Sequence, residues 1–284
     1  MRTPKSRAVF NVDGFRRGAP ALLLAAVGCA VVLALAACSS SWNTRSAMSP
    51  SGGSTYSLMQ MNLCLSGLGG CYGKVAYPAG VEEAVARIRE AHPDAVTVNE
   101  ACRGDVARIA RRSGYRLRFA RGIYQGKPLR CIQPGGRGLF GDAVLTKVPV
   151  ASSDSRPFKT QAGIERRGWL CVATRVGVEV CTAHLATLAL DEVAANGPQC
   201  EELGALLARR AASGTVIFGG DLNRPSSCAP DGFWTRSDRS AQQQPGLQQV
   251  YGVRALHSPS AEVIPARHTD HDFLLVRAHL AAQR

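Results

Sequence analysis

The chain of 284 residues lacks the short motifs that mark several large classes of enzymes and metal sites. It has no Gly-x-Ser-x-Gly sequence, which disfavours a serine hydrolase with a nucleophile elbow. The absence of His-Glu-x-x-His disfavours a zinc metalloprotease, and the absence of Cys-x-x-Cys disfavours a zinc ribbon. The glycine-rich segment 131–141 does not end in Gly-Lys-Ser/Thr, so it does not predict a phosphate-binding P-loop. The sequence contains no internal repeat.

Acidic residues are scarce, with 21 Asp and Glu against 34 Lys and Arg. Residues 1–37 carry five of the basic residues and one acidic residue, so the remainder is still clearly basic. A basic protein is drawn to polyanions such as nucleic acid, anionic lipid headgroups and phosphorylated polymers. An arginine-rich solvated surface without a ligand explains the charge equally well. One region suits a phosphate backbone because it gathers six arginines. These are Arg108, Arg111, Arg112, Arg116, Arg118 and Arg121.

The N-terminus has the three parts of an export signal. Basic residues precede an apolar run over residues 21–37, and small residues come directly before Cys38. The sequence Leu-Ala-Ala-Cys also resembles a bacterial lipobox, in which the cysteine is lipidated and becomes the new N-terminus. An uncleaved membrane anchor is the alternative, but the run is short for a spanning helix and lacks a stop-transfer flank. A lipoprotein on the extracytoplasmic side of the cell membrane is therefore predicted.

These features divide the chain into three parts. Residues 1–38 are expected to be the signal peptide with its lipobox cysteine. Residues 39–55 are rich in Ser and Gly and are expected to form a flexible tether. Residues 56–284 are expected to form the folded domain, which we predict to be a monomer.

Cysteine usage agrees with export. Outside the signal and its lipobox eight cysteines remain, and an even number in an oxidising compartment predicts disulfides. Eight cysteines allow 105 pairings, and the sequence does not choose among them. We favour the pair Cys200–Cys228 and, as a second pair, Cys64–Cys71.

Short apolar strands alternate with helical patterns in the folded region. Val81, Val85 and Ile88 recur at helical spacing. The segment 169–185 predicts a hairpin that turns near Gly177. Pro198 is expected in the first turn of a later helix. Hairpins mixed with crossover helices favour an α/β domain with a mixed sheet over a purely parallel one.

Polar side chains stand at the ends of five of the predicted apolar strands. An α/β sheet gathers strand ends along one edge, where active sites tend to lie. Taken singly, each residue has an ordinary explanation as a turn residue or a solvated group. Only the set and its order favour a site. The set is Asn62, Glu100, His184, Asp221 with Asn223, and Asp270 with His271.

This set suits the hydrolysis of a phosphate ester. Mg²⁺ binds carboxylate oxygens, waters and substrate oxygens, so Glu100 is a candidate ligand with Asn62 as a supporting amide. Asp221 is the candidate for aligning or deprotonating a water that Asn223 fixes in place. The two glycines before Asp221 are expected to let the backbone turn sharply, so that both polar side chains face the phosphate.

The remaining steps need a partner for the leaving oxygen and a clamp on the phosphoryl group. A histidine with a pKa near neutrality serves the leaving oxygen, and His184 and His271 are the candidates. Arg167, directly before the hairpin, is a candidate clamp for a non-bridging oxygen.

The motifs "MQMNL", "VTVNEAC", "GDAVLT", "CTAHLA", "GGDLN" and "TDHDFLLV", in this order, resemble the endonuclease/exonuclease/phosphatase superfamily. The resemblance spans roughly residues 56–280. It implies the deoxyribonuclease I-like fold, a four-layer α/β/β/α sandwich of two mixed sheets. It also implies a divalent metal, Mg²⁺ or alternatively Mn²⁺ or Ca²⁺. By matching of motifs, the metal set is Asn62, Glu100 and Asp270, and the catalytic set is His184, Asp221, Asn223 and His271.

The chain departs from the family pattern at several positions. Asn99 stands where the family usually has Gln, and Thr269 stands for Ser. Asp142 occupies a position where the family often has Asn, and a carboxylate there is unhelpful near phosphate unless it binds a cation. Gln248 stands where the family usually has an Asp that orients the histidine. A Gln hydrogen-bonds an imidazole but does not stabilise its cation as a carboxylate does.

Three functions remain open from the sequence. The first is an extracellular metal-dependent phosphodiesterase, and within this class an endonuclease with nucleic acid as its partner is favoured. The second is a sphingomyelinase-like phospholipase C or a phosphomonoesterase of the same fold, which membrane tethering favours slightly. The third is a non-catalytic lipoprotein that binds polyanions, against which the retained polar set argues.

Overall fold

The computed structural model describes residues 54–68, 72–189 and 191–281. Cys38 with the expected signal, and Cys71, lie outside these residues, so lipidation and the Cys64–Cys71 pair stay predictions. The first strand begins at Thr55, one residue before the expected start of the domain. The carbonyl of Ser54, assigned to the tether, already accepts a hydrogen bond from the Leu280 amide at 2.8 Å. In the part of the chain described, no helix is long and apolar enough to cross a membrane.

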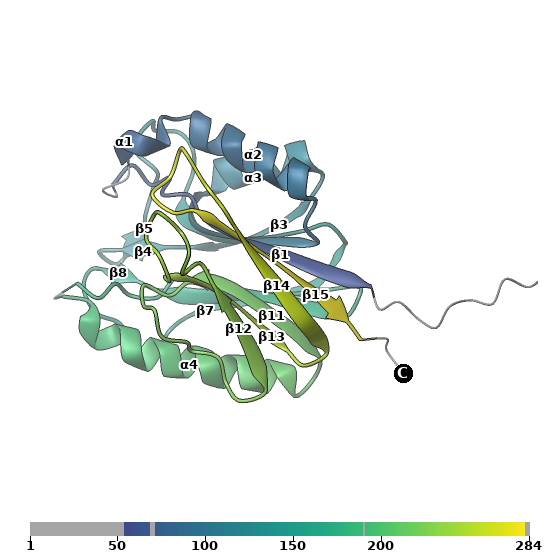
Figure 1. The fold of residues 1–284 in the computed structure, drawn as a ribbon. Helices are drawn as coiled ribbons and strands as arrows, with labels where there is room; N and C mark the ends of the chain where they lie inside the picture. Colours follow the sequence, from purple (N-terminus) through teal and green to yellow (C-terminus); the bar gives the residue numbers. More distant parts are fainter. Residues whose placement is uncertain (1–53, 69–71, 190, 282–284) are drawn as a thin grey trace, which may run out of the picture. The chain divides into compact units, whose positions relative to one another are not determined.

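Two mixed sheets of six strands each lie at the centre of the domain (Figure 1). The first sheet has the order β14-β15-β1-β2-β6-β3, and only β1 and β2 pair in parallel. Its strands are β1 (Thr55–Asn62), β2 (Ala95–Cys102), β3 (Arg116–Arg121), β6 (Phe140–Thr146), β14 (Leu256–Ile264) and β15 (Phe273–Leu280).

The second sheet has the order β12-β13-β11-β10-β9-β7, and only β10 and β11 pair in parallel. Its strands are β7 (Val150–Pro157), β9 (Gly168–Thr174), β10 (Val178–Ala183), β11 (Thr215–Asp221), β12 (Phe233–Ser237) and β13 (Gln248–Val253). A small third sheet is formed by β4 (Ile123–Tyr124), β5 (Lys127–Pro128) and β8 (Glu165–Arg166).

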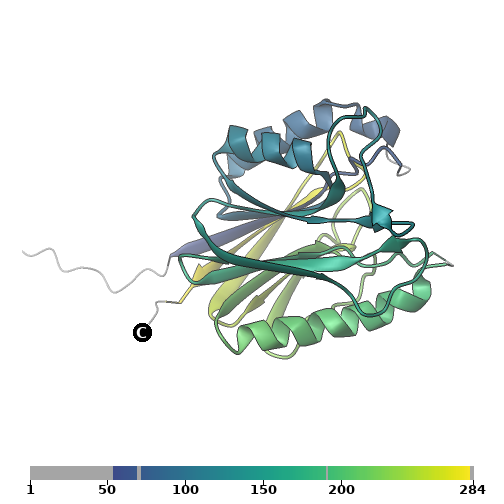
Figure 2. The ribbon, with the colours of Figure 1, turned by 180° about the vertical axis from the view of Figure 1, so that it is seen from behind.

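Helices cover the outer faces of both large sheets. On the first sheet lie α1 (Tyr72–Val75), α2 (Ala79–Ala91) and α3 (Arg103–Ser113), and on the second lies α4 (Val193–Ala211). Figure 2 shows the four layers from the opposite side. The expected α/β/β/α sandwich is therefore confirmed.

Alternation of side chains along the strands builds three apolar layers. In β1, Leu58 packs into the layer between the two sheets, together with Val180 and Ile217. Met59, the next residue in β1, packs on the other face, in the layer under α2 and α3. The third layer joins the second sheet to α4. It includes Leu203, Leu206, Leu207, Phe218 and Tyr251.

Helix α4 begins earlier than the position of Pro198 predicts. Its first residue is Val193, so Pro198 lies inside the helix rather than in its first turn. Side chains on either side of Pro198 hold two neighbouring loops, since Asn196 Nδ2 donates to the Leu222 carbonyl at 3.0 Å. Gln199 Oε1 accepts the amide hydrogen of Ala186 at 2.8 Å. These tertiary hydrogen bonds override the local preference of proline for the start of a helix.

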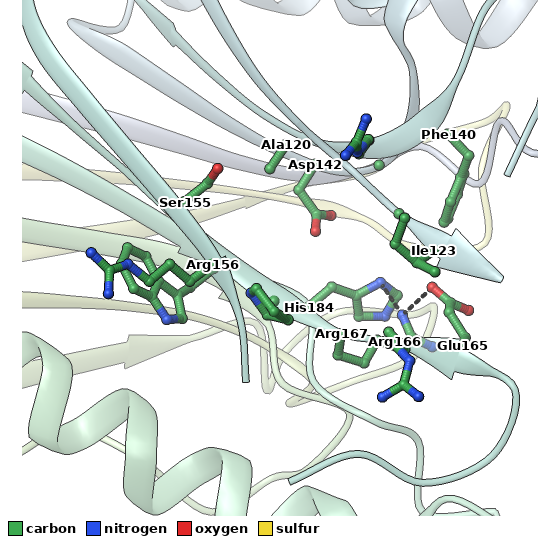
Figure 3. A pocket seen from close by; sticks show the side chains of 16 residues that line it. Ala120, Ile123, Phe140, Asp142, Ser155, Arg156, Glu165, Arg166, Arg167 and His184 are labelled. Carbon is green, nitrogen blue, oxygen red and sulfur yellow. Dashed lines mark hydrogen bonds and ion pairs between the residues drawn. The ribbon is translucent and has the colours of Figure 1, made fainter. Parts of the chain in front are cut away.

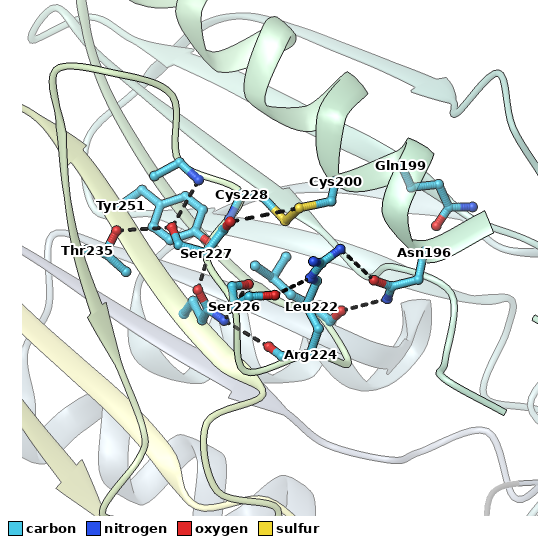
Figure 4. Close-up of a disulfide and its surroundings, with 12 residues drawn as sticks. Asn196, Gln199, Cys200, Leu222, Arg224, Ser226, Ser227, Cys228, Thr235 and Tyr251 are labelled. Atoms are coloured by element: carbon cyan, nitrogen blue, oxygen red, sulfur yellow. Dashed lines mark hydrogen bonds between the residues drawn. A yellow bond between two sulfur atoms is a disulfide. The ribbon is translucent and has the colours of Figure 1, made fainter. Parts of the chain in front are cut away.

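Three disulfides lie among the described residues: Cys102–Cys131, Cys171–Cys181 and Cys200–Cys228. The predicted Cys200–Cys228 pair is confirmed. It fastens α4 to the loop that follows β11 (Figure 4). In the same loop the amide of Cys228 donates to the hydroxyl of Tyr251 at 2.8 Å. The segment after Asn223 is thus held from two sides.

The two glycines before Asp221 serve close packing and not a sharp turn. Gly219 and Gly220 lie inside the extended strand β11, and neither has a positive φ. A Cβ on Gly219 would come within 2.5 Å of Thr97 Oγ1 in the facing sheet. A Cβ on Gly220 would come within 2.3 Å of the Ala183 carbonyl. The expected turn is therefore wrong, because what needs glycine is the approach of β11 to its neighbours.

Replacement of Gly220 by alanine is predicted to destabilise the domain by on the order of 2–3 kcal/mol, because the Ala183 carbonyl must move. In thermal unfolding this corresponds to a Tm lower by roughly 4–12 °C. Gly214→Ala is the control, since nothing lies within 4 Å of the position that a Cβ would take there. A Gly220→Ala variant as stable as Gly214→Ala would contradict the packing argument.

Candidate active site

Residues from the two sheets meet at adjoining strand ends. Asn62 ends β1 and Glu100 lies in β2, while Asp221 ends β11 in the second sheet. The amide nitrogen of Asn62 donates to Glu100 Oε1 at 3.0 Å and to Asp221 Oδ2 at 2.9 Å. His184 follows β10 and forms an isolated parallel bridge with Asp221. The predicted gathering of polar strand ends is therefore present.

Glu100 sits on an irregular piece of backbone. The pairing of β2 with β6 shifts register between Val98 and Ala101, and Glu100 inside this bulge has a φ of 53°. Such left-handed backbone is rare for residues other than glycine and concentrates at functional sites. Its carbonyl accepts the amide hydrogen of Leu65 at 2.8 Å. The bulge turns the Glu100 side chain towards Asn62.

The Glu100 carboxyl is held in a poorly solvated, acidic environment. Burial raises its pKa to about 7, the hydrogen bond from Asn62 and the charge of Arg167 lower it, and the carboxylates of Asp221 and Asp270 raise it again. A carboxyl in this setting is stabilised by a cation nearby.

His184 is held between an arginine and an amide. Arg167 Nη1 lies 2.8 Å from Nδ1, and the side-chain nitrogen of Asn223 lies 2.9 Å from Nε2. Burial and the Arg167 charge lower the pKa of His184 to about 3, so the ring is neutral. Arginine only donates, so Nδ1 accepts, and the side-chain nitrogen of Asn223, which also donates to the Leu185 carbonyl at 3.0 Å, lies against Nε2. His184 Nε2 is 3.9 Å from Glu100 Oε1 and 4.0 Å from Asp221 Oδ2.

Arg167 lies behind His184 and is not free to clamp a phosphoryl oxygen as expected. Its side chain is 8% exposed, and its guanidinium also contacts Glu165 at 3.2 Å and Glu192 at 3.7 Å. Figure 3 shows the contacts with His184 and Glu165 as dashed lines. The charge of Arg167 is therefore compensated, and its geometry suits orienting His184.

Asp221 connects both histidines. Its Oδ2 lies 3.4 Å from His271 Nε2, and its Oδ1 accepts the amide hydrogen of Asn223 at 2.9 Å. Burial alone would raise the pKa of Asp221, but the two histidines and the hydrogen bonds lower it overall. Asp270 Oδ1 lies 3.9 Å from His271 Nε2. The site thus presents an ionised, hydrogen-bonded carboxylate at its centre.

Asn99 joins the two sheets directly beneath the site. Its Oδ1 accepts the backbone amide hydrogen of Asp221 at 2.9 Å and a hydrogen from Gln60 Nε2 at 2.8 Å. Its Nδ2 donates to Asp142 Oδ1 at 2.9 Å and to Thr182 Oγ1 at 3.4 Å. The sequence indicates Asn99 only as a departure from the family. An amide at the end of an apolar strand is the available signal for this role.

The donor set fits a divalent cation on carboxylate ligands. Glu100 and Asp270 offer oxygens beside the ionised Asp221, and carboxylate oxygens are the ligands that Mg²⁺ prefers. Asn62 suits a supporting role better than ligation, because its Oδ1 accepts from the Cys64 amide at 3.1 Å and its nitrogen faces the carboxylates. Its position is therefore that of a residue that orients the ligands.

Away from the site, the described residues bring Cys171, Glu179 and Cys181 close enough to share a metal. The two cysteines form a disulfide, so neither supplies a thiolate. This cluster does not compete with the strand-end site as a metal centre.

Comparison with solved structures shows which known proteins share the fold of this domain. A structure of an endonuclease/exonuclease/phosphatase from Beutenbergia cavernae is similar with a TM-score of 0.59 and 19% identity, covering 80% of this chain and 72% of that one. The Danio rerio TDP2 structure complexed with single strand DNA product has a TM-score of 0.54 and 14% identity, covering 80% and 99%. The human Nocturnin catalytic domain with bound sulfate has a TM-score of 0.55 and 15% identity, covering 79% and 93%.

At these identities the similarity shows the fold alone. A search of curated protein sequences finds no significant match. A family model described as the endonuclease/exonuclease/phosphatase family matches residues 40–282, most of the chain. The chain therefore belongs to the endonuclease/exonuclease/phosphatase family, whose members hydrolyse phosphoester bonds.

Proposed function

We propose that this chain is an exported, lipid-anchored, divalent-metal-dependent phosphodiesterase that acts as an endonuclease on nucleic acid. One observation carries the proposal: a central Asp221 lies within 4.0 Å of both His184 and His271 and shares the Asn62 amide with Glu100. Carboxylates, a neutral imidazole and a second histidine at one point suit in-line attack of water on a phosphate.

The residues divide the work as follows. The ionised Asp221, fixed by Asn62 and the Asn223 amide, orients the attacking water and accepts its proton. Neutral His184 borders the space of the phosphoryl group, with Arg167 and Asn223 holding the ring. His271 faces the same space. A divalent cation, held by Glu100 and Asp270, would supply positive charge to the phosphoryl oxygens.

Surface charge supports a nucleic-acid substrate. Arg116, Arg118 and Arg121 are exposed on the edge strand β3, and Arg116 and Arg118 alternate with partly buried positions. The neighbouring Arg108 and Arg112 are both paired with Glu82, so their charge is partly compensated. Several exposed arginines along one strand suit an extended polyanion better than a single headgroup. The structurally similar TDP2 from Danio rerio is complexed with a single-strand DNA product, which agrees with this class of substrate.

Export and anchoring rest on the N-terminal sequence. The basic, apolar and small-residue segments before Cys38 carry them. The three disulfides agree with an oxidising compartment, where such bonds persist.

The Gln248 departure changes the surroundings of His271. Gln248 Nε2 donates to Asp238 at 3.4 Å and to the carbonyl of Asp272, and its Oε1 accepts from Gln60 at 3.3 Å. Within the described residues, His271 Nδ1 is buried without a hydrogen-bond partner. The expected bond from Gln248 to the imidazole is thus not formed, since three other groups take up its amide. The buried Asp238, which accepts from Gln248, is a carboxyl group close to this part of the site.

Asp238 is predicted to make stability fall as pH rises. Burial raises the pKa of its carboxyl to about 6, against 3.8 in the unfolded chain, so the folded state holds its proton more tightly. Stability is lost as pH rises from about 4 to 6, because only the folded state opposes ionisation. Asp238→Asn should remove this loss. The difference in free energy of unfolding, variant minus wild type, should therefore increase by on the order of 1–3 kcal/mol between pH 4 and pH 7.

The measurement is thermal unfolding of both proteins at pH 4, 5, 6 and 7 with a chelator present. Parallel curves for wild type and variant would show that Asp238 titrates at its ordinary pKa. Asp231→Asn, in an exposed turn, is the control and should follow the wild type at every pH.

Nicking of supercoiled plasmid DNA tests the proposed activity. The protein from residue 39 should nick with Mg²⁺ and not with a chelator. His271→Ala should slow nicking by at least about 100-fold because it removes a group beside Asp221. His257→Ala is the matched control, as His257 is exposed on β14. Turnover of sphingomyelin or a phosphomonoester without nicking selects the second function, and salt-sensitive DNA binding without any turnover selects the third.

Lipid anchoring has its own test in cells. Cys38→Ala should lose incorporation of a radiolabelled fatty acid and should leave the membrane fraction. Cys29→Ala, inside the expected signal, should keep the label. Labelled, membrane-bound Cys38→Ala protein would overturn the lipobox assignment.

A further inference from the structure

A cavity of about 370 Å³ adjoins the candidate active site and has no part in the chemistry assigned above. His184 lies on its boundary, so the cavity is continuous with the catalytic groups. Its walls come from β3 and β6 of the first sheet, from β7 and β9 of the second, and from β4 and β8. The cavity therefore offers room for a part of a substrate held at His184, among the side chains that Figure 3 shows.

The size and lining of the cavity exclude a phosphate group as its only occupant. A volume of 370 Å³ lies in the range of pockets that hold organic ligands. Phe140 and Ile123 contribute aromatic and apolar surface to the walls. Planar rings bind such surfaces by stacking, as bases do in single-strand binding proteins. The lining thus suits a flat, partly apolar group.

Two carboxyl groups also face this space. Asp142, held by the Asn99 amide at 2.9 Å, points into it from the first sheet, and Glu165 lies across from it beside Arg167. A carboxylate repels phosphate and accepts hydrogen bonds from amino groups. The amino and imino groups of a nucleobase are donors of this kind. This gives Asp142, which the family pattern does not explain, a positive role in binding.

Cationic side chains stand at the rim. Arg121, Arg156 and Arg166 are exposed and line the same cavity. The carboxyl groups inside the cavity suit an uncharged ligand group that donates hydrogen bonds, and the arginines at the rim suit a phosphate attached to that group. A choline headgroup is disfavoured because the arginines outnumber the carboxyls and repel a fixed positive charge.

We propose that this cavity is a nucleoside subsite, which holds the base and sugar next to the scissile phosphate while the rim arginines bind the following phosphate. The inference rests on the proposed nuclease function and names the part of the substrate that the protein reads. Bases with an exocyclic amino group should bind more tightly than thymine, since the amino group donates to Asp142.

The first test measures binding without turnover. Isothermal titration calorimetry should show saturable binding of dGMP in the presence of a chelator. Deoxyribose 5-phosphate, which lacks the base, should bind at least tenfold more weakly, and dTMP should fall between the two.

The second test narrows the cavity. Ser155, exposed on the edge strand β7, lines the cavity, and Ser155→Phe should weaken dGMP binding at least tenfold. Ser153→Phe is the matched control, because Ser153 is exposed on the same strand and does not line the cavity. Arg156→Ala truncates an exposed side chain and should weaken dGMP binding severalfold. It replaces Ser155→Phe as the test if that variant does not fold.

The two proposals fail separately. Absence of all nuclease turnover with base-dependent binding of dGMP overturns the proposed function and supports the subsite. For an active enzyme, Ser155→Phe should lower kcat/KM for a dinucleotide, and Ser153→Phe should leave it within twofold of the wild-type value. Equal binding of dGMP and deoxyribose 5-phosphate, unchanged binding in Ser155→Phe, or tighter binding of phosphocholine than of dGMP overturns the subsite.

Discussion

The side chain of Asn99 fixes the distance between the two halves of the site. It lies in the first sheet and accepts the backbone amide hydrogen of Asp221 from the second. Glu100 is the next residue along the chain, so one amide aligns the carboxyl of one sheet with the carboxylate of the other. Hydrogen bonds inside a poorly solvated interior are costly to leave unmade, so the whole arrangement is strongly specified.

Around this contact the site is built from charges that oppose each other. Burial works against ionisation of Glu100, while hydrogen bonds from Asn62 and from the Asn223 backbone help to keep Asp221 ionised. Burial and the charge of Arg167 keep His184 neutral, and Arg167 is itself balanced by Glu165 and Glu192. The result is a pocket with one stable anion, one neutral imidazole and one carboxyl whose charge depends on a neighbouring cation. Such separation of roles among similar groups is what acid–base chemistry on phosphate requires.

The sequence predicts the parts of the site whose position follows from strand ends. Asn62, Glu100 and Asp221 can be placed together because polar residues ending apolar strands gather at one edge. The clamp predicted for Arg167 is wrong, because a sequence does not show that Glu165 and Glu192 are already beside its guanidinium. The turn predicted at Gly219 and Gly220 is wrong too, since the approach of the facing sheet is a tertiary property.

Strands and disulfides also differ in whether the sequence predicts them. The exposed edge strands β7 and β14 have no apolar alternation to reveal them, because both faces meet water for much of their length. The Cys171–Cys181 disulfide is predictable from the sequence, since a hairpin turning near Gly177 sets these two cysteines opposite each other. The Cys102–Cys131 disulfide is not predictable in this way, because its cysteines come from separate segments that only the fold brings together.

Strand β1 runs straight through the domain, with Thr55 at one end and Asn62 at the other. Eight residues of extended chain span roughly 25 Å. The N-terminal tether therefore joins the domain at the end of β1 that lies away from the catalytic groups. If the proposed lipid anchor holds the domain to a bilayer, the catalytic groups lie at the end of β1 that is farther from the membrane. That orientation would favour long polymers in the surrounding medium over a headgroup in the same membrane.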